Sequence, residues 1–493
     1  MGIIARQGIK YSIISYLSFL LGTFSTIFIY PANPEFLGKL RFIQPSAELI
    51  CPFILFGLSY ANIKYHQKLK AKNQHIDFLY ICIKFILSNF IFISFIYWLF
   101  SKIFPSIQWS DSWNMKQYVL PVALSLALTQ LLSKYMSNLK RITIPGIFEN
   151  FFPKLGALTA FISYIYLGIS QKNALFIFVS FFVIAVFGLV YYFIRLNKDR
   201  KSGSLSILHD REVRLNLLSF CLFSVLGSIG NRLALQIDNL MIPELLDFKQ
   251  NGIYSILASI VGFLTVPVMG IFTISGPIIV EKLENNKLDE LNNFYRKVSK
   301  FLFLFGTMLL SCILAGIDYL FLFMKNGKEL ADAKVIIYIL GASTLFDLST
   351  GFNSNIISYS KYFRFTIYAM LLLAVFTIVS NIIFISYFKL GIEGIALATA
   401  ISLTLFNLIK LGFNYQKFGI HPFSREYIYI LLTGIIGVLL VYNLPDFTNN
   451  FLNLVSKPVI ILLIFFLSNV WFKFIPIKEL FSTNIKSFLT GKN

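Results

Sequence analysis

Long apolar runs are the feature that most constrains this chain. Fourteen stretches of about 18 residues or more are dominated by apolar side chains. A run of that length crosses the hydrocarbon layer as a helix, because backbone groups in lipid must bond to one another. The sequence therefore predicts an all-α polytopic membrane protein with about 14 transmembrane helices. The predicted spans are 9–30, 40–65, 78–100, 117–136, 147–169, 174–195, 214–237, 251–280, 298–324, 333–357, 363–388, 392–416, 427–443 and 457–475.

The composition excludes several other classes of protein. Of the 493 residues, 57% are apolar and only 13% are charged, too few to cover the surface of a soluble protein of this length. All four cysteines fall within predicted spans, which excludes a secreted disulfide scaffold. The sequence has no Gly-x-x-x-x-Gly-Lys-Ser/Thr loop, so we expect no nucleotide-driven motor and no cofactor beyond a coupling ion.

The net charge of +20 indicates orientation. Most lysines and arginines fall at the N-terminus, in the loops on its side and in the C-terminal tail, and basic loops remain cytoplasmic. We therefore expect both termini in the cytoplasm. Nucleic-acid binding would need an extramembrane domain. No loop exceeds about twenty residues, so we expect the bilayer as partner and no nucleic acid.

A weak internal repeat organises the chain. The stretch 37–69 parallels 251–283 at an offset of 214, and each copy has a proline in mid-span, Pro52 and Pro267. A second pair of similar turns, 167–169 and 390–392, follows the fifth and eleventh spans. Six spans separate the members of each pair, so the copies have parallel orientation.

The repeat predicts how the chain divides. Two parallel six-helix lobes around a central cavity are a known transporter architecture. We expect an N-terminal lobe at 1–200, a C-terminal lobe at 201–420, and two additional spans with a cytoplasmic tail at 421–493.

Several segments resemble a known family. The run Asn-Arg-Leu-Ala-Leu-Gln-Ile-Asp-Asn-Leu-Met-Ile at 231–242, the Asn-Gly-Ile-Tyr-Ser at 251–255 and the turn at 390–399 resemble the polysaccharide-flippase branch of the multidrug/oligosaccharidyl-lipid/polysaccharide (MOP) exporter superfamily. The resemblance covers nearly the whole chain in span number and loop length. It is weaker in the N-terminal half, where Pro-Ala-Asn-Pro-Glu at 31–35 replaces the segment that would match 237–242.

The resemblance implies a cargo. Members of that branch, including Wzx-type O-antigen flippases of lipopolysaccharide synthesis, move undecaprenyl-diphosphate-linked oligosaccharides to the outer leaflet. Two six-helix lobes form their V-shaped cavity. By this resemblance, the expected location is the bacterial inner membrane, and the expected partners are a lipid-linked oligosaccharide and polysaccharide-assembly proteins.

Ionisable side chains inside the spans need an explanation, because each costs about 2.5–3.5 kcal/mol on insertion scales. Lys84 and Lys410 lie about two turns from the predicted cytoplasmic ends, and Arg41 lies near an outer end. These three long side chains are expected to extend to the headgroups.

Four residues are not explained in this way: Glu48, Lys154, Arg232 and Asp347. Arg232 shares one helical stripe with Ser228 and Gln236, beside a second stripe with Asn231 and Asp238. Asp347 lies in a polar run that includes Asn353 and Asn355. This run is typical of the wall of a wet cavity, and a buried hydrogen-bonded seam is the alternative. A substrate site and a structural network are both open interpretations of the Arg232 face.

A lipid-linked diphosphate requires cations in a polar cavity. An arginine side chain can donate two N–H groups side by side to one phosphate group. We expect Arg232 and Lys154 to contact the diphosphate, with Lys84 and Arg41 as weaker candidates. Hydrogen bonds to the cargo are expected from Asn231, Gln236, Asn353 and Asn355. Asp238, Asp347 and Glu48 are expected to hold the cations or to couple transport to H⁺ or Na⁺.

Three alternatives stay open. A multidrug or cation antiporter of the same superfamily would carry organic cations, and a lipid-linked peptidoglycan precursor would be another cargo for the same fold. A membrane glycan polymerase would need a large outer loop with catalytic residues. The longest outer stretch, 101–116, holds one acidic residue and no histidine, so we do not expect an enzyme.

Overall fold

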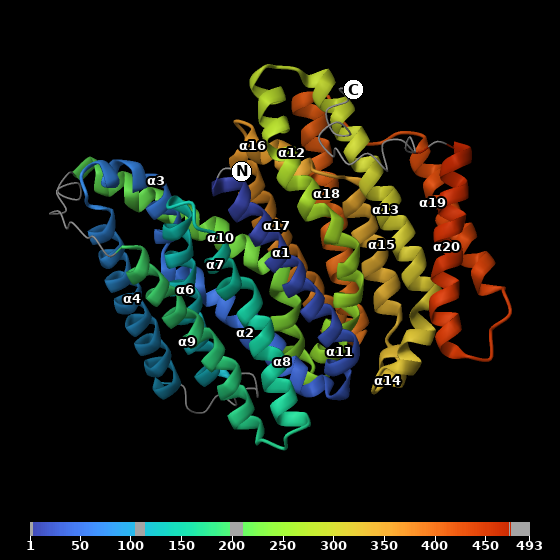
Figure 1. Cartoon of the computed structure of the whole chain (residues 1–493), viewed down its shortest axis with the longest axis horizontal. Coiled ribbons are helices and arrows are strands. Elements are labelled where there is room, and N and C mark those ends of the chain that lie inside the picture. The colour runs from blue at the N-terminus through green and yellow to red at the C-terminus, as the bar shows by residue number, and fades with distance from the viewer. Residues whose placement is uncertain (1–2, 104–113, 198–210, 473, 475–493) are drawn as a thin grey trace. The chain divides into compact units, whose positions relative to one another are not determined.

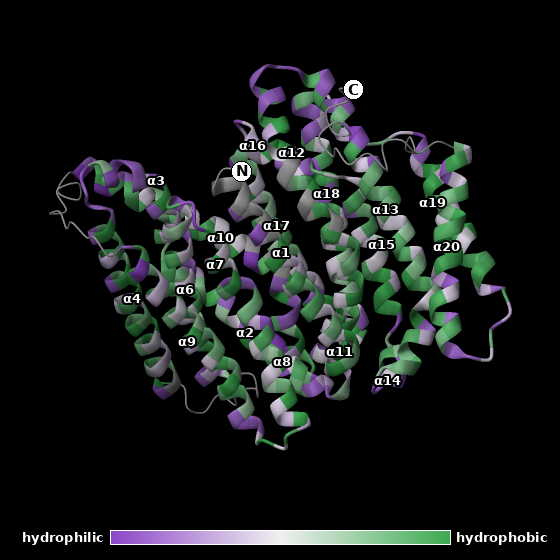
Figure 2. Ribbon diagram, viewed as in Figure 1, coloured by the Kyte–Doolittle hydropathy of each residue, from purple (hydrophilic) through white to green (hydrophobic). Residues whose placement is uncertain are grey.

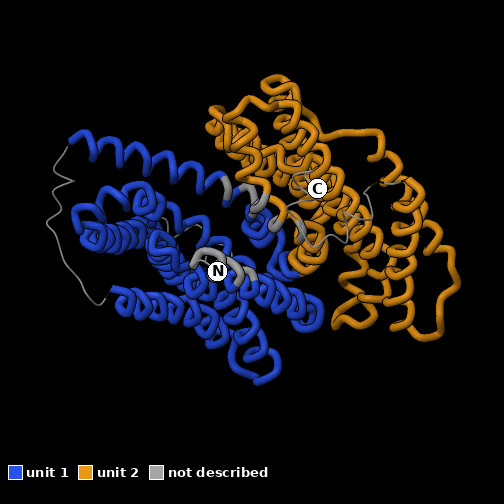
Figure 3. Tube along the Cα trace, turned by 45° about the horizontal axis from the view of Figure 1, so that its top comes forward, with its two compact units in different colours: residues 1–252 blue, residues 253–493 orange. Residues whose placement is uncertain are grey.

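The computed structural model describes residues 3–103, 114–197, 211–472 and 474. Throughout these residues the regular structure is helical, with no strand, which confirms the predicted all-α class. The chain divides into two compact units, residues 1–252 and 253–493 (Figure 3). The sequence predicted a boundary at 200, whereas helix α10 (Arg211–Leu245) packs against α2 (Pro34–Leu55) and so belongs to unit 1. The division into two six-helix lobes remains a prediction.

Unit 1 is a bundle in which α2 packs against α6 and α10, and α9 packs against α6 and α8 (Figure 1). The basic loop at 198–210 and part of the outer stretch 101–116 lie outside the described residues. The remaining helical segments of this unit are α1 (Ile3–Phe24), α3 (Leu58–Ala71), α4 (His75–Ile103), α6 (Lys116–Asn138), α7 (Thr143–Gly146), α8 (Phe152–Ile165) and α9 (Gln171–Leu196), with short π or 3-10 turns at Ser25–Ile29, Tyr30–Ala32 and Ile147–Phe151.

Unit 2 is organised around a long helix, α13 (Leu288–Phe323), which packs against α15, α19 and α20. A second group pairs α18 with α15 and α17. The other helical segments are α11 (Phe248–Gly262), which begins in unit 1, α12 (Val266–Glu284), α14 (Gly327–Asp332), α15 (Val335–Ser349), α16 (Asn353–Tyr359), α17 (Phe363–Ile382), α18 (Gly391–Phe418), α19 (Glu426–Tyr442) and α20 (Asn450–Phe472), with short turns at Phe263–Thr265 and Ile383–Tyr387.

Each of the fourteen predicted ranges coincides with a helix or an interrupted run of helices. Among the described residues, nine helices are long and apolar enough to cross a membrane, and the bent pairs α2–α3 (43°) and α15–α16 (48°) raise this number to eleven. Figure 2 shows apolar residues along most of these helices. The chain is therefore a multi-pass membrane protein. The count of fourteen stays a prediction, since α19 is short and two other ranges are interrupted.

The break between α2 and α3 follows from two residues. Pro52 has no N–H, so it weakens the helix, and Gly57 adopts a left-handed φ of 70°. The side-chain amide of Asn89 on α4 donates to the freed carbonyl of Ile54 at 3.2 Å. A Cβ at Gly57 would lie 2.6 Å from the carbonyl oxygen of Cys221. The break therefore requires glycine and brings α10 against the bend.

A comparable break separates α15 from α16 in unit 2. Gly351 has a φ of 53°, and a Cβ there would lie 2.1 Å from the hydroxyl oxygen of Ser299. The Tyr295 hydroxyl donates to the carbonyl of Thr350 at 2.7 Å. Side chains thus replace the backbone partners lost at the break, as a membrane interior requires. Both broken helices carry a predicted functional carboxylate shortly before the break, Glu48 and Asp347.

Two glycines allow a close backbone contact in unit 1. A Cβ at Gly38 would lie 1.7 Å from the carbonyl oxygen of Phe248, and a Cβ at Gly252 would lie 1.8 Å from that of Pro34. The side-chain amide of Asn251 donates to the carbonyl of Gly38 at 2.9 Å. The two glycines are separated by the offset of the predicted repeat. Only hydrogen fits at either position.

We predict that Gly38→Ala and Gly252→Ala each lower stability by about 1–3 kcal/mol or more, because the added methyl group overlaps backbone atoms. Gly412→Ala is the control. It lies in α18, where nothing comes within 4 Å of the place that a methyl group would take, so alanine should leave stability unchanged or raise it by up to about 1 kcal/mol. The measurement is the thermal unfolding midpoint of purified protein in detergent. Wild-type midpoints for both crossing variants would contradict the close contact.

Candidate functional site

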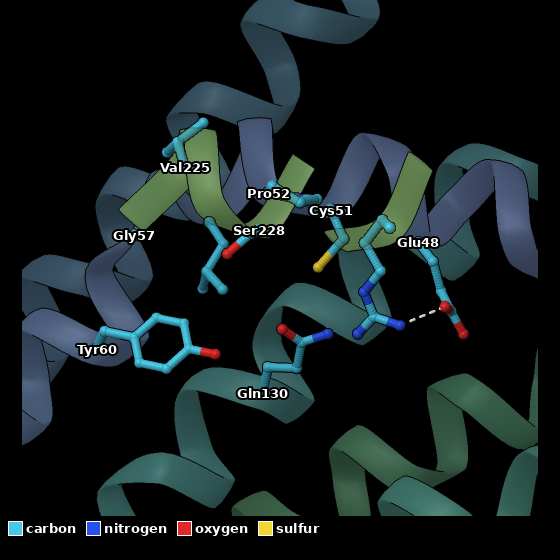
Figure 4. Close-up of a pocket in the computed structure, with 10 residues that line it drawn as sticks. Glu48, Cys51, Pro52, Gly57, Tyr60, Gln130, Val225 and Ser228 are labelled. Atoms are coloured by element: carbon cyan, nitrogen blue, oxygen red, sulfur yellow. Dashed lines mark hydrogen bonds and ion pairs between the residues drawn. The ribbon is translucent and has the colours of Figure 1, made fainter. Parts of the chain in front are cut away.

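A cavity opens in unit 1 beside the break between α2 and α3. It encloses about 480 Å³, including open solvent at its mouth, and is bounded by α2, α3, α6 and α10. Figure 4 shows Tyr60, Gln130 and Cys51 directed toward a common space. The polar groups along its wall are Glu48, Cys51, Tyr60, Gln130, Ser228 and Arg232.

An ion pair crosses the wall of this cavity. Nη1 of Arg232 on α10 donates to Oε2 of Glu48 on α2, the bond marked by a dashed line in Figure 4. The other oxygen, Oε1, accepts a hydrogen bond from Nε2 of Gln44 at 2.9 Å. The Glu48 side chain is 11% exposed and that of Arg232 is 34% exposed. The carboxylate is therefore enclosed, while the guanidinium keeps an open edge.

The predicted polar face of α10 reaches this cavity in part. Ser228 and Arg232 lie one turn apart and both line the wall, as the helical spacing predicted. Gln236, one turn further on, is not part of the wall and accepts a hydrogen bond from Asn239 at 3.2 Å. Asp238 is half-buried on the same helix, and the side chain of Asn231 lies outside the described structure.

The other predicted cations do not line the cavity. Lys154 on α8 is exposed, and its Nζ donates to the carbonyl of Ser18 on α1 at 3.1 Å. The charge of Arg41 acts on Lys154 electrostatically, so these two cations lie in one region. Lys84 is exposed on α4, as expected for a side chain that extends to the headgroups.

A cation that sequence reasoning missed lies beside the cavity. Nζ of Lys134 on α6 lies 5.9 Å from the ring centroid of Tyr60, which lines the wall. Lys134 follows Gln130 by one helical turn. Because Lys134 was predicted to lie near the end of a span, nothing in the sequence indicated that it would lie beside a cavity. Gln130 and Tyr60 carry no charge inside a span, so the search for intramembrane charges passed over them.

Asp347 and Asn353 lie in a buried polar seam of unit 2. Nδ2 of Asn407 donates to Oδ1 of Asp347 at 2.7 Å. Oδ1 of Asn407 accepts hydrogen bonds from Asn353 at 3.2 Å and from Thr350 at 3.3 Å. Asn353, Thr350 and Asn407 are at most 2% exposed. The wet-wall interpretation is therefore wrong for Asn353, because α18 supplies its partner, while Asn355 is only half-buried.

Lys410 corrects a second expectation. Instead of extending to the headgroups it is 3% exposed, and its Nζ donates to the hydroxyl oxygen of Ser354 at 2.9 Å. The available signal was its spacing: Asn407, Lys410 and Asn414 share one face of α18. A polar stripe of that kind indicates burial against other helices.

The cavity can hold water or a small charged group. In the described parts of the chain, no group of three or more histidine, cysteine, aspartate or glutamate residues is placed to hold a metal ion. The charged groups on or beside the wall are Glu48, Arg232 and Lys134. Lys134 also acts electrostatically on a second carboxylate, Glu149, so these groups balance in charge, and Arg232 is the part-exposed side chain of the ion pair on the wall.

We predict that Glu48 and Arg232 are energetically coupled. Glu48→Gln or Arg232→Gln alone leaves a charge without its partner and should cost about 1–3 kcal/mol, whereas the double variant should cost less than the sum. The pair Lys287–Glu290, joined at 3.0 Å with side chains 55% and 53% exposed, is the control, with coupling of at most about 0.5 kcal/mol. Unfolding in detergent measures both cycles. Additive effects at Glu48 and Arg232 would contradict the pairing.

Comparisons with known proteins identify the fold. No protein-family model matches the sequence, and no curated protein matches it. The lipid II flippase MurJ in an inward closed conformation superposes with a TM-score of 0.68 at 16% identity, over 94% of this chain and 99% of that chain.

Two further solved structures agree. An inward-facing multidrug resistance MATE family transporter of the MOP superfamily has a TM-score of 0.62 at 12% identity, over 89% of this chain and 100% of that one. A MOP superfamily transporter from Pyrococcus furiosus, described as having a binding pocket of reverse polarity, has a TM-score of 0.51 at 14% identity, over 90% and 96%. The chain has the fold of the MOP superfamily transporters.

Proposed function

We propose that the protein is a transporter that moves the head group of a polyprenyl-diphosphate-linked oligosaccharide across the cytoplasmic membrane by alternating access. Its fold is one used by a lipid II flippase, and its chain is multi-pass. The observation that carries the proposal is the open edge of Arg232 inside a polar cavity. Cytoplasmic termini and the bacterial inner membrane are part of the proposal: the first rests on the distribution of basic residues, the second on the sequence resemblance at 231–242 and 390–399.

Arg232 has the chemistry to hold a diphosphate. A guanidinium carries five N–H donors in a planar fork, and the bond to Glu48 uses one of them. Phosphate oxygens accept such donors in pairs, which adds both energy and orientation. Lys134 supplies a second positive charge beside Tyr60. Because Lys134 also acts on the carboxylate of Glu149, Arg232 is the cation on which the proposal depends.

Glu48 explains how the cavity tolerates this arginine when no cargo is present. An unpaired guanidinium within the bilayer is costly, and the carboxylate neutralises it. An arriving diphosphate replaces the carboxylate as the partner of Arg232. Glu48 keeps its hydrogen bond from Gln44 when the diphosphate displaces it from Arg232. Without cargo, Glu48 thus occupies the position on Arg232 that the diphosphate takes when it binds.

Lys154 and Arg41 are proposed as a secondary site for the cargo. Their positive charges lie in one region of unit 1 apart from the cavity wall. A head group that leaves Arg232 would meet them as a further attractive point. The weaker candidates are Asp238, Gln236 and Lys84, which lie outside the cavity wall, and Asn231, whose side chain is not described.

The alternatives differ in the charge of the cargo. The multidrug resistance MATE transporter represents the antiporter alternative. A site for an organic cation would present a carboxylate that no arginine neutralises. Here Glu48 is already paired, so an anionic cargo is favoured. A lipid-linked peptidoglycan precursor has the same diphosphate chemistry, and the MurJ likeness favours it. The O-antigen cargo rests on the sequence resemblance at 231–242 and 390–399.

We predict that removing the guanidinium lowers the rate of translocation strongly. Arg232→Gln combined with Glu48→Gln keeps the cavity neutral, so a folded double variant isolates the loss of the cation. Transport of a fluorescent polyprenyl-diphosphate sugar by proteoliposomes should fall about ten- to a hundredfold, the equivalent of one charge-assisted hydrogen bond. Arg214→Gln, an exposed arginine at the start of the same helix, should transport at the wild-type rate.

Two outcomes would overturn this proposal. Wild-type transport by the double variant would remove Arg232 from the site. Efflux of organic cation dyes by the wild-type protein, with no movement of the diphosphate lipid, would assign the antiporter function instead.

A further inference from the structure

Unit 2 contains a buried lysine that the proposed head-group site does not use. Lys410 lies in α18, about two turns before the end of the helix, and is 3% exposed. Its Nζ lies 2.9 Å from the Ser354 hydroxyl and 3.9 Å from the ring centroid of Phe406. A hydroxyl and an aromatic face are weak partners for an ammonium group removed from water.

Asp347 is the counter-charge of this lysine. Asn407, about one turn before Lys410 on α18, donates a hydrogen bond of 2.7 Å to the carboxylate of Asp347, and the charge of this carboxylate acts on Lys410. Asn407 is itself fixed by Thr350 and Asn353. The acidic group is therefore positioned by a buried network, while the lysine can move on its flexible stem.

Within the described residues, the helices packed against α18 bring no other carboxylate to Lys410. The face of α17 beside it is apolar, where Leu373 and Phe376 meet Phe406 across a small gap. The charged residue of α17, Arg364, is exposed at its first turn, and the turn Ile383–Tyr387 has none. On α18 itself, Glu393 lies in the first turn and Lys417 in the last. Among these neighbours, Asp347 is the group that sets the charge around Lys410.

A metal ion is a poor occupant for this seam. The carboxylate and amide oxygens of Asp347 and Asn407 are of the type that hard cations prefer. However, Asn407 Oδ1 already accepts two hydrogen bonds, and the lysine ammonium supplies a positive charge beside them. A proton, in contrast, needs no coordination shell. A buried lysine can release it, whereas arginine remains charged.

We propose that Lys410 binds and releases the proton that couples transport to the pH gradient, with Asp347 as its counter-charge. On release an N–H bond of the ammonium breaks, the electron pair stays on the nitrogen, and water accepts the proton as H₃O⁺. Uptake reverses this step. The seam then alternates between carrying and lacking the positive charge of Lys410, next to the break between α15 and α16. The inference rests on the proposed function, but on a different unit from Arg232.

The test uses proteoliposomes that contain the full-length protein and a fluorescent polyprenyl-diphosphate sugar. A gradient of one pH unit can shift the distribution of a proton-coupled cargo between leaflets by about tenfold. We expect that shift for the wild type and for the control Lys417→Met, an exposed lysine on the same helix. Lys410→Met and Lys410→Arg should show no shift, since neither side chain exchanges a proton near neutral pH.

Head-group binding separates this proposal from the proposed function. Purified Lys410→Arg should bind the diphosphate lipid as the wild type does, because Arg232 and Glu48 in unit 1 are unchanged. A tenfold pH response in Lys410→Arg, or a wild-type response to Na⁺ alone, would overturn the role of Lys410 and leave the flippase function intact. If the wild-type protein moves no diphosphate lipid in any gradient, the proposed function fails and the coupling proposal fails with it.

Discussion

A bilayer interior offers no water to solvate charge, and this constraint governs the arrangement of both units. In unit 1, Arg232 is neutralised by Glu48, and the pair lies on the wall of a polar cavity. In unit 2, Asp347 and Lys410 lie in a seam of buried asparagines. Each arrangement makes a charge tolerable without removing its reactivity. The first leaves an open edge of guanidinium for an anion, and the second leaves a lysine that can exchange a proton.

Broken helices create the space for these charges. Pro52 and Gly57 end α2 where α10 approaches, and Gly351 separates α15 from α16. Side chains such as Asn89 and Tyr295 bond to the freed carbonyls, so the backbone stays satisfied away from water. Continuous helices would leave no such bend beside Glu48 or Asp347. The fold therefore uses interrupted helices where its proposed chemistry is located.

The sequence predicted the helices better than the site. Apolar runs report lipid exposure directly, so the predicted ranges coincide with helices. Glu48 and Arg232 were recognised as anomalous, but their pairing joins residues distant in the chain, and a single sequence carries no signal of such contacts. Lys410 was misjudged because its distance from a helix end is the same whether it extends to the headgroups or lies buried. Asn407 and Asn414 on the same face held the missing information.

Our central claim is that an anionic head group binds Arg232 in the position that Glu48 occupies when no cargo is bound. It is tested most directly by an electron cryo-microscopy structure with a polyprenyl diphosphate bound. We expect phosphate density within about 3 Å of the Arg232 guanidinium, the distance of a charge-assisted hydrogen bond, with Glu48 displaced from it. Phosphate density elsewhere, with the Arg232–Glu48 pair intact, would contradict the claim.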